Sequence, residues 1–304
     1  MATHNQVRIV GYISEKPNVH RDRYGIVDRI ILGMTAVRRD IQGYGGNRLT
    51  MLNITYNGKD QAMLDQLSSL KQFDIIDVKG VVEIINANRR SECPNCMEEN
   101  EAFTTLLTVF PQFVYKLGSY AQAQDISRLS ALNPESASFL ESSPEFNLIR
   151  RYKEVSNQAL LIGTVITKPQ LVEDEKTGTK FCRYMIGVDR KFVLDRSEDS
   201  RKAADYPWVY TYGRQAEEDA KRLKGSQENE AGSRVFVEAA VSTEKVEKHW
   251  KCANCGQEYT TEVNGSKLIA YSVEYLSNYL TKEDENREEG SDLISSILAG
   301  SGFE

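Results

Sequence analysis

The amino-acid sequence predicts a mainly β protein built from two tandem copies of one small barrel. Three observations support this prediction: an internal repeat, alternating apolar residues of the kind found in strands, and one short helical pattern in each copy. The chain has 304 residues, which is enough for two domains of ordinary size. Its 40% hydrophobic content is sufficient for two cores.

The repeat is visible as a gapless match of residues 5–39 with residues 157–191. The shared residues are Asn5/Asn157, Gln6/Gln158, Gly11/Gly163, Lys16/Lys168, Pro17/Pro169, Asp22/Asp174 and Arg38/Arg190. The match then recurs in two blocks, Thr55-Tyr56 with Thr211-Tyr212 and residues 76–82 with residues 235–241. We infer that one ancestral domain was duplicated.

Each copy is expected to run strand, strand, strand, helix, strand, long hairpin, strand. The second strand of each copy shows the period of two that is typical of a half-buried strand. Its inward residues would be Ile30, Leu32, Met34 and Ala36 in the first copy and Cys182, Tyr184, Ile186 and Val188 in the second.

A short helix is expected after the third strand of each copy. Asp60 is placed to cap a helix that carries Met63, Leu64 and Leu67, and the counterpart is expected from Glu217 to Leu223. Five strands with one helix between the third and the fourth is the order of an OB-fold, a partly open barrel that commonly binds oligonucleotides.

The predicted boundaries are 1–118 for the first OB-fold, 119–155 for a partly helical linker, 156–280 for the second OB-fold and 281–304 for an acidic tail. The tail holds seven acidic side chains against two basic ones, so the body of the chain is near neutral although the net charge is −6. Tails of this kind usually bind partners or keep a protein in solution. No apolar run approaches the ~20 residues that span a bilayer, and the start lacks a signal-peptide pattern, so a cytoplasmic location is expected.

Four stretches of the second copy are specific enough to indicate a family: GTVITKPQLVEDEKTGTKFCRYMIGVDR, YPWVYTYGRQAEEDAKRL, SRVFVEAAVSTEKVEKHW and EYTTEV. In this order they resemble the bacterial-type single-stranded DNA-binding protein family. The resemblance implies an OB-fold, non-catalytic coating of single-stranded DNA, four OB-folds per working unit, and an acidic tail that recruits replication and repair proteins. The chain departs from the family pattern in its two C-x-x-C pairs and in its last residues, Gly302-Phe303-Glu304.

The strongest binding signal is a stripe of aromatic residues at alternate positions of one strand, Tyr206, Trp208, Tyr210 and Tyr212. Alternate residues share one face of a strand, and bases of any sequence stack on such rings at roughly 1–3 kcal/mol each. The alternative is a core face, although Val209 and Thr211 suit the core better. The resemblance places Tyr206, Tyr212 and Trp250 at base-stacking positions, and Phe192 near another.

Cations recur at matched positions in both copies, at the ends of the second strands and along the long hairpins. Such residues contact phosphates or form an ordinary solvated face. The candidate DNA-binding residues are Arg38, Arg39, Tyr56, Arg89, Arg90, Arg190, Lys191, Phe192, Tyr206, Trp208, Tyr210, Tyr212, Lys248 and Trp250.

The first copy is expected to contribute less to base stacking. In the alignment above, the stripe corresponds to Thr50, Leu52, Ile54 and Tyr56, and Trp250 corresponds to Ser91. The first copy would then hold the DNA backbone more than the bases, or serve in assembly.

Each copy also carries one C-x-x-C pair at the same hairpin position, Cys93/Cys96 and Cys252/Cys255. One pair is half of a four-cysteine zinc site. A usual zinc ribbon places its second pair ~15–20 residues further on, whereas here 155 residues intervene. The hypothesis is therefore a structural Zn shared by two hairpin tips, from one chain or from two. The alternative is free thiols. Cys182, on a core strand, is expected to be a small buried hydrophobe.

Catalysis is not indicated, because His4, His20 and His249 have no nearby nucleophile pattern and residues 43–46 form a turn rather than a phosphate loop. The sequence therefore predicts sequence-independent coating of single-stranded DNA, in replication, recombination or repair. The alternative is a zinc-organised OB-fold scaffold that binds replication proteins. Two barrels per chain make a homodimer the equivalent of a four-barrel unit.

Overall fold

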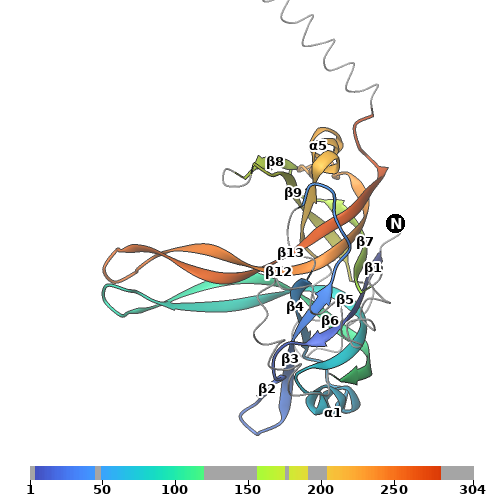
Figure 1. Ribbon diagram of the computed structural model, residues 1–304. Coiled ribbons are helices and arrows are strands. Elements are labelled where there is room, and N and C mark those ends of the chain that lie inside the picture. The colour runs from blue at the N-terminus through green and yellow to red at the C-terminus, as the bar shows by residue number, and fades with distance from the viewer. Residues whose placement is uncertain (1–3, 45–48, 120–155, 175–177, 191–203, 282–304) are drawn as a thin grey trace, which may run out of the picture.

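The computed structural model describes residues 4–44, 49–119, 156–174, 178–190 and 204–281 (Figure 1). We call residues 4–119 repeat one and residues 156–281 repeat two. The predicted linker helix and the acidic tail lie outside the described residues, apart from their outermost positions. Neither described helix is long and apolar enough to cross a membrane.

The described chain is mainly β, as predicted, with two helices. Repeat one contains β1 (His4–Ile13), β2 (Asn18–Arg21), β3 (Val27–Val37), β4 (Leu49–Tyr56), α1 (Gln61–Ser69), β5 (Asp74–Glu92) and β6 (Glu99–Ser119). Repeat two contains β7 (Asn157–Val165), β8 (Gln170–Glu173), β9 (Lys180–Asp189), β10 (Ala204–Asp205), β11 (Trp208–Tyr212), α5 (Gly213–Arg222), β12 (Arg234–Lys251) and β13 (Glu258–Ser277).

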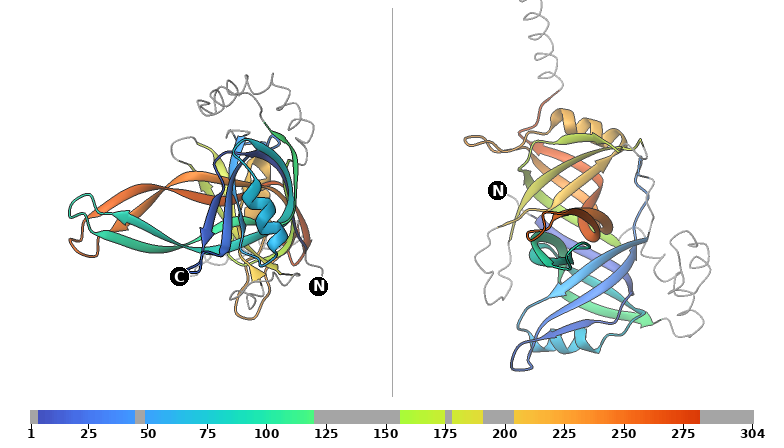
Figure 2. Two further views of the ribbon diagram at one scale, coloured as in Figure 1. Left: turned by 90° about the horizontal axis from the view of Figure 1, so that it is seen from below. Right: turned by 90° about the vertical axis from the view of Figure 1, so that its left-hand side faces the viewer.

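Hydrogen bonds close a ring of five strands in each repeat. In repeat one the ring runs β1, β5, β6, β4, β3 and back to β1. In repeat two the corresponding ring runs β7, β12, β13, β11, β9 and back to β7. Figure 2 shows the two rings stacked end to end, with α1 at one extreme and α5 at the other. The identical strand order is what a duplicated domain requires.

The predicted inward residues of β3 and β9 are all buried, including Cys182. Burial, followed by the nearby Asp219 carboxylate, raises the pKa of the Cys182 thiol to about 12, as expected for an inert core residue. The Asp60 carboxylate accepts a hydrogen bond from the Ala62 backbone N–H and so caps α1 as predicted. The boundary predicted for its counterpart was wrong, because α5 starts at Gly213, directly after β11, and ends at Arg222.

Two kinds of residue that the repeats share, an asparagine and a glycine, have a structural role in the rings. The Asn5 side chain bonds both backbone groups of Val82, and the Asn157 side chain bonds both backbone groups of Val241. The shared glycine permits ring closure, because a Cβ atom on Gly11 would lie 2.2 Å from the carbonyl oxygen of Thr35.

The rings are joined by antiparallel pairing of β1 with β7, which makes one continuous sheet. Val7 faces Ala159 at the centre of this pairing, and these two residues are equivalent in the repeat. The two repeats are therefore related by an approximate two-fold axis.

The β5–β6 and β12–β13 hairpins run past their rings and project side by side (Figure 1). We call the outer part of this pair, residues 86–105 and 245–264, the arm. Asn100 holds its two hairpins together: its Oδ1 accepts from the backbone N–H of Ala253, and its Nδ2 donates to Tyr259 Oη at 3.2 Å. Asn100 and Tyr259 are themselves equivalent positions, so the approximate two-fold axis also passes along the arm.

Candidate nucleic-acid interface and metal centre

Three aromatic residues of the predicted stripe lie on the outer face of repeat two. Tyr206 is 49% exposed, and Trp208 and Tyr210 are partly exposed. The residues that alternate with Trp208 and Tyr210 along β11, Val209 and Thr211, are fully buried and face the interior of the ring. This arrangement leaves the aromatic rings accessible along one strand.

Tyr212 differs from the rest of the stripe, because it is only 7% exposed. Its ring lies 4.6 Å from the ring of Tyr44, which comes from repeat one, and 6.0 Å from the ring of Phe181. The prediction that Tyr212 belongs to an accessible base-stacking face therefore needs correction, because another ring covers it.

The structure adds three residues to this face that the sequence interpretation missed. Phe181 lies on β9 with its ring 5.7 Å from Tyr210, Lys267 places its Nζ 4.9 Å from the centre of the Tyr210 ring, and Arg183 is exposed opposite Tyr210. Phe181 and Arg183 alternate with the inward residues of β9, so the period of two could have revealed them. Lys267 has no comparable signal, because its place depends on the parallel pairing of β11 with β13.

Tyr56 was wrongly taken for an accessible aromatic residue. It is 5% exposed, packs in the core of repeat one and lies 5.2 Å from the Phe110 ring. The strand pairings explain the error. Ile30 faces Tyr56, and its equivalent Cys182 faces Thr211, so the partner of Tyr56 in the repeat is Thr211 rather than Tyr212. A shift of one residue moves every side chain of a strand to its other face.

Trp250 lies at the outer end of β12 and is also largely covered, with 6% of its surface exposed. Its ring is nearly parallel to that of Tyr259 at 6.3 Å, and its Nε1 donates to Thr261 Oγ1. Lys248 lies over the ring at 4.7 Å. An open hollow of about 390 Å³ borders Trp250 and Tyr259, so a base could reach the edge of this pair but not an open face.

Most of the predicted cations are engaged within the protein. Arg190, whose side chain is 9% exposed, makes a two-pronged ion pair with Asp205 at 2.6 Å, and it lies 3.7 Å from the buried Glu83 of repeat one. This arginine locks the two repeats together, which corrects its assignment as a phosphate contact. Its equivalent, Arg38, is buried over the ring of Tyr44, and burial lowers the pKa of its guanidinium.

The remaining cations follow the same trend. Arg39 pairs with Glu238 and covers the ring of Tyr271, and Arg89 donates to the backbone oxygen of Asn264 across the arm. Arg90 is 63% exposed but pairs with two glutamates of β6. Lys191 and Phe192 lie outside the described residues. Contacts of these arginines with DNA phosphates would therefore compete with the ion pairs and hydrogen bonds that they make within the protein.

The four cysteines of the C-x-x-C pairs meet at the tip of the arm. All four Sγ atoms lie within 4.8 Å of one another, and the pairs Cys93–Cys255 and Cys96–Cys252 are separated by 3.7 and 3.6 Å. A tetrahedral zinc with Zn–S bonds of about 2.3 Å requires sulfur atoms roughly 3.8 Å apart. The set could therefore hold a metal ion, within one chain.

Both C-x-x-C loops have the same local geometry. The backbone N–H of the residue after the second cysteine donates to the carbonyl of the first, at Met97 and at Gly256. Both of these residues have a positive φ, 60° for Met97 and 71° for Gly256. A backbone hydrogen bond at Glu98 lowers the pKa of the Cys96 thiol, but burial and hydrogen bonds with the other three cysteines outweigh this effect and raise the pKa to about 11. Backbone N–H groups of the second loop, that of Cys255 foremost, lower the pKa of the Cys252 thiol to about 6. Thiolate is the form that binds metals.

Comparison with known proteins agrees with this architecture. A family model described as the single-strand binding protein family matches residues 156–268. The single-stranded DNA-binding protein of Clostridium tetani is 31% identical over 120 residues, which cover 40% of this chain and 70% of that protein. Single-stranded DNA-binding protein 2 of Clostridium acetobutylicum is 28% identical over 120 residues, 40% of this chain and 76% of that protein. This chain belongs to the single-strand binding protein family, of the bacterial type.

The chain is also similar to solved structures. The single-stranded DNA-binding protein of Thermus aquaticus is 15% identical, with 93% of this chain and 97% of that chain covered and a TM-score of 0.48. The Plasmodium falciparum protein in complex with ssDNA is 16% identical, with 40% of this chain and 95% of that chain covered and a TM-score of 0.27.

Proposed function

We propose that this protein coats single-stranded DNA, without catalysis and without a sequence code. The observation that carries the proposal is the accessible row formed by Tyr206, which lies two residues before β11, and by Trp208 and Tyr210 on the outer face of β11. Arg183 is exposed beside this row and can attract the phosphates of a strand whose bases lie on the rings, whereas Lys267, also beside it, is already paired with Glu244 at 2.6 Å. A duplex keeps its bases stacked inside, so it cannot use such a row.

Each ring with its helix is assigned as an OB-fold, with 1–118 and 156–280 as the two domains. The assignment is supported by the strand order and by the place of α1 and α5 between the third and fourth strands of their rings.

The test of binding is a titration of the full chain with a labelled oligothymidylate of about 30 nucleotides, roughly the combined site of two OB-folds. Fluorescence anisotropy should show binding that a duplex competitor of the same length barely displaces. The affinity should fall as salt rises, because counterions leave the DNA on binding. Equal competition by duplex and single strand would contradict the proposal.

We further propose that the four-cysteine cluster holds a structural zinc ion that ties the two hairpins of the arm. Four thiolates favour zinc over hard cations such as Mg²⁺ and Ca²⁺. The donor set is closed by protein ligands, so the site would fix structure and leave no open position for a reaction. Elemental analysis of protein purified without chelator should find about one zinc per chain.

The partners proposed beyond DNA are a second copy of this chain and replication or recombination proteins. The outer face of β6 supports the first, because Phe113 and Tyr115 are 56% and 55% exposed side by side on it. Light scattering should give the mass of a dimer, and the double substitution of both residues by Ser should give the mass of one chain. The acidic tail, residues 281–304, would recruit the protein partners. The alternative function, a scaffold that binds proteins only, would leave oligothymidylate unbound.

A further inference from the structure

The loop between β3 and β4 of repeat one reaches across to repeat two. We call residues 38–44 of this loop the strap. Its turn is closed by the backbone N–H of Tyr44, which donates to the carbonyl of Ile41. Gly43 has a φ of 77°, and a Cβ atom there would lie 2.7 Å from the backbone nitrogen of Gly213. The backbones of the two repeats therefore touch at two glycines.

The strap ends with the Tyr44 ring seated on Tyr212, at 4.6 Å between ring centres. The guanidinium of Arg38 lies 4.5 Å from the centre of the Tyr44 ring, and Tyr44 Oη donates to Glu244 Oε1 at 2.6 Å. Burial and this bond to Glu244 raise the pKa of the Tyr44 phenol, so the hydroxyl remains a donor at neutral pH. One aromatic residue of repeat one thus covers one of the aromatic residues of the row in repeat two.

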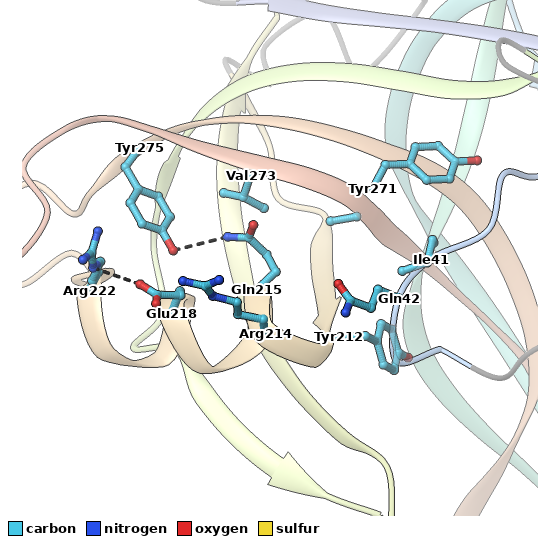
Figure 3. Close-up of a pocket in the computed structure, with 11 residues that line it drawn as sticks. Ile41, Gln42, Tyr212, Arg214, Gln215, Glu218, Arg222, Tyr271, Val273 and Tyr275 are labelled. Atoms are coloured by element: carbon cyan, nitrogen blue, oxygen red, sulfur yellow. Dashed lines mark hydrogen bonds and ion pairs between the residues drawn. The ribbon is translucent and has the colours of Figure 1, made fainter.

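A groove of about 460 Å³ lies between the strap and α5 (Figure 3). Ile41 and Gln42 line it from the strap, and Tyr212, Arg214 and Tyr271 line it from repeat two. Arg214 is exposed, and it makes no ion pair within the part of the chain that the structure describes. The groove is therefore lined at one end by a ring whose face is already covered and, further along α5, by the exposed guanidinium of Arg214, which points toward Glu218 (Figure 3).

We propose that this groove is a nucleotide subsite of repeat two, and that Tyr44 of repeat one occupies its base position in the free protein. A base of single-stranded DNA would displace Tyr44 from Tyr212, and the adjoining phosphate would lie against Arg214. Displacement costs Tyr44 its contacts with Tyr212, Arg38 and Glu244. It is feasible because a stacked base contributes at least as much free energy as a ring pair of this kind, and Glu244 keeps its ion pair with Lys267. Repeat one would thereby control access to a stacking position of repeat two. This inference rests on the proposed binding of single-stranded DNA.

The test compares the wild-type full chain with Tyr44→Ala in a stopped-flow and anisotropy titration with labelled oligothymidylate. Removal of the competing ring should tighten binding roughly two- to tenfold, since ring contacts of this kind contribute on that scale. The association rate should rise as well. Tyr44→Phe keeps the ring but loses the bond to Glu244, so it should change affinity in the same direction by less. Tyr24→Ala removes a tyrosine that is 71% exposed and remote from the strap, and should bring no gain.

The double variant Tyr44→Ala/Tyr212→Ala distinguishes two explanations of tighter binding. Either the substitution of Tyr44 uncovers the Tyr212 ring, or it alters the strap in a way that does not involve Tyr212. If the uncovered Tyr212 ring takes a base, the gain of Tyr44→Ala should disappear in the double variant. Weaker or unchanged binding by both Tyr44→Ala and Tyr44→Phe would overturn the subsite proposal. Tyr44→Phe differs from the wild type by one hydroxyl group, so its result decides the matter if Tyr44→Ala folds poorly. A wild-type chain that fails to bind the oligonucleotide would instead overturn the proposed function.

Discussion

The two repeats share their strand order and their joining residues, but they differ on the strand that would face DNA. With the register that the strand pairings give, Tyr206, Trp208, Tyr210 and Tyr212 of repeat two correspond to Met51, Asn53, Thr55 and Asn57 of repeat one. Repeat one thus has no aromatic residue at these positions. The features that both repeats retain, namely the asparagine–backbone clasp, the closing glycine and the C-x-x-C loop, all serve the fold or its assembly. The aromatic row on which we propose that bases stack therefore belongs to repeat two alone, and we propose a supporting role for repeat one.

The largest effect is expected at the proposed zinc site, to which each repeat contributes two cysteines. Cys93→Ser and Cys252→Ser each remove one of four ligands and should each abolish stoichiometric zinc, because structural sites of this kind need all four. Elemental analysis and thermal unfolding of the two variants should agree closely. A site that depends on only one of the two cysteines would contradict the shared centre.

The next largest effect is a difference in stability between the variants Arg190→Ala and Arg38→Ala, which change equivalent residues of the two repeats. Arg190→Ala leaves Glu83 and Asp205 buried without their cation, which should lower the free energy of unfolding by about 3–5 kcal/mol. Arg38→Ala loses a ring contact and a bond to a backbone oxygen, worth about 1–2 kcal/mol. Urea denaturation measures both. If Arg38→Ala lowers the free energy of unfolding more than Arg190→Ala does, Arg190 does not join the repeats in the way described.

Substitution of an aromatic residue should reduce stability in repeat one and DNA binding in repeat two. Tyr56→Ala opens a cavity in the core of repeat one and should cost about 3–5 kcal/mol of stability. Trp208→Ala should leave stability nearly unchanged and weaken oligothymidylate binding by about 1–3 kcal/mol, a loss that persists at high salt. If folded Tyr56→Ala loses more affinity than Trp208→Ala, repeat two is not the principal binder.

The smallest effect is expected from deletion of residues 281–304. This segment carries seven acidic side chains against two basic ones and would repel DNA or compete with it for cations. The truncated chain should bind oligothymidylate equally well or slightly more tightly at low salt. A large loss of affinity would assign the segment to the fold or to the DNA site.

Much of the fold could be predicted from local pattern. Alternation revealed the inward residues of β3 and β9, and the side chain of Asp60 revealed the start of α1. The meeting of the four cysteines also followed from the sequence, because the repeat placed one pair at the same point of each long hairpin.

The site was harder to predict, since it depends on contacts between the repeats. The matching Thr-Tyr pairs suggested that Tyr56 corresponds to Tyr212, but the two strands differ in register by one residue, and the pairing partner of each residue decides which face it takes. The arginines looked available because nothing in the sequence shows that Glu83 and Asp205 lie beside Arg190. The cover of Tyr212 by Tyr44 could not be predicted either, because it joins segments far apart in the chain.

The central claim is that bases lie on the exposed row of repeat two, and the two tryptophans of the chain test it most directly. Both belong to repeat two, but Trp208 lies on the outer face of β11, whereas Trp250 is covered by Tyr259 and Lys248. We expect oligothymidylate to quench the fluorescence of Trp250→Phe, which retains Trp208, strongly and in step with anisotropy. Quenching in Trp208→Phe, which retains Trp250, should be weak. Binding by anisotropy without quenching of Trp208 would contradict the claim.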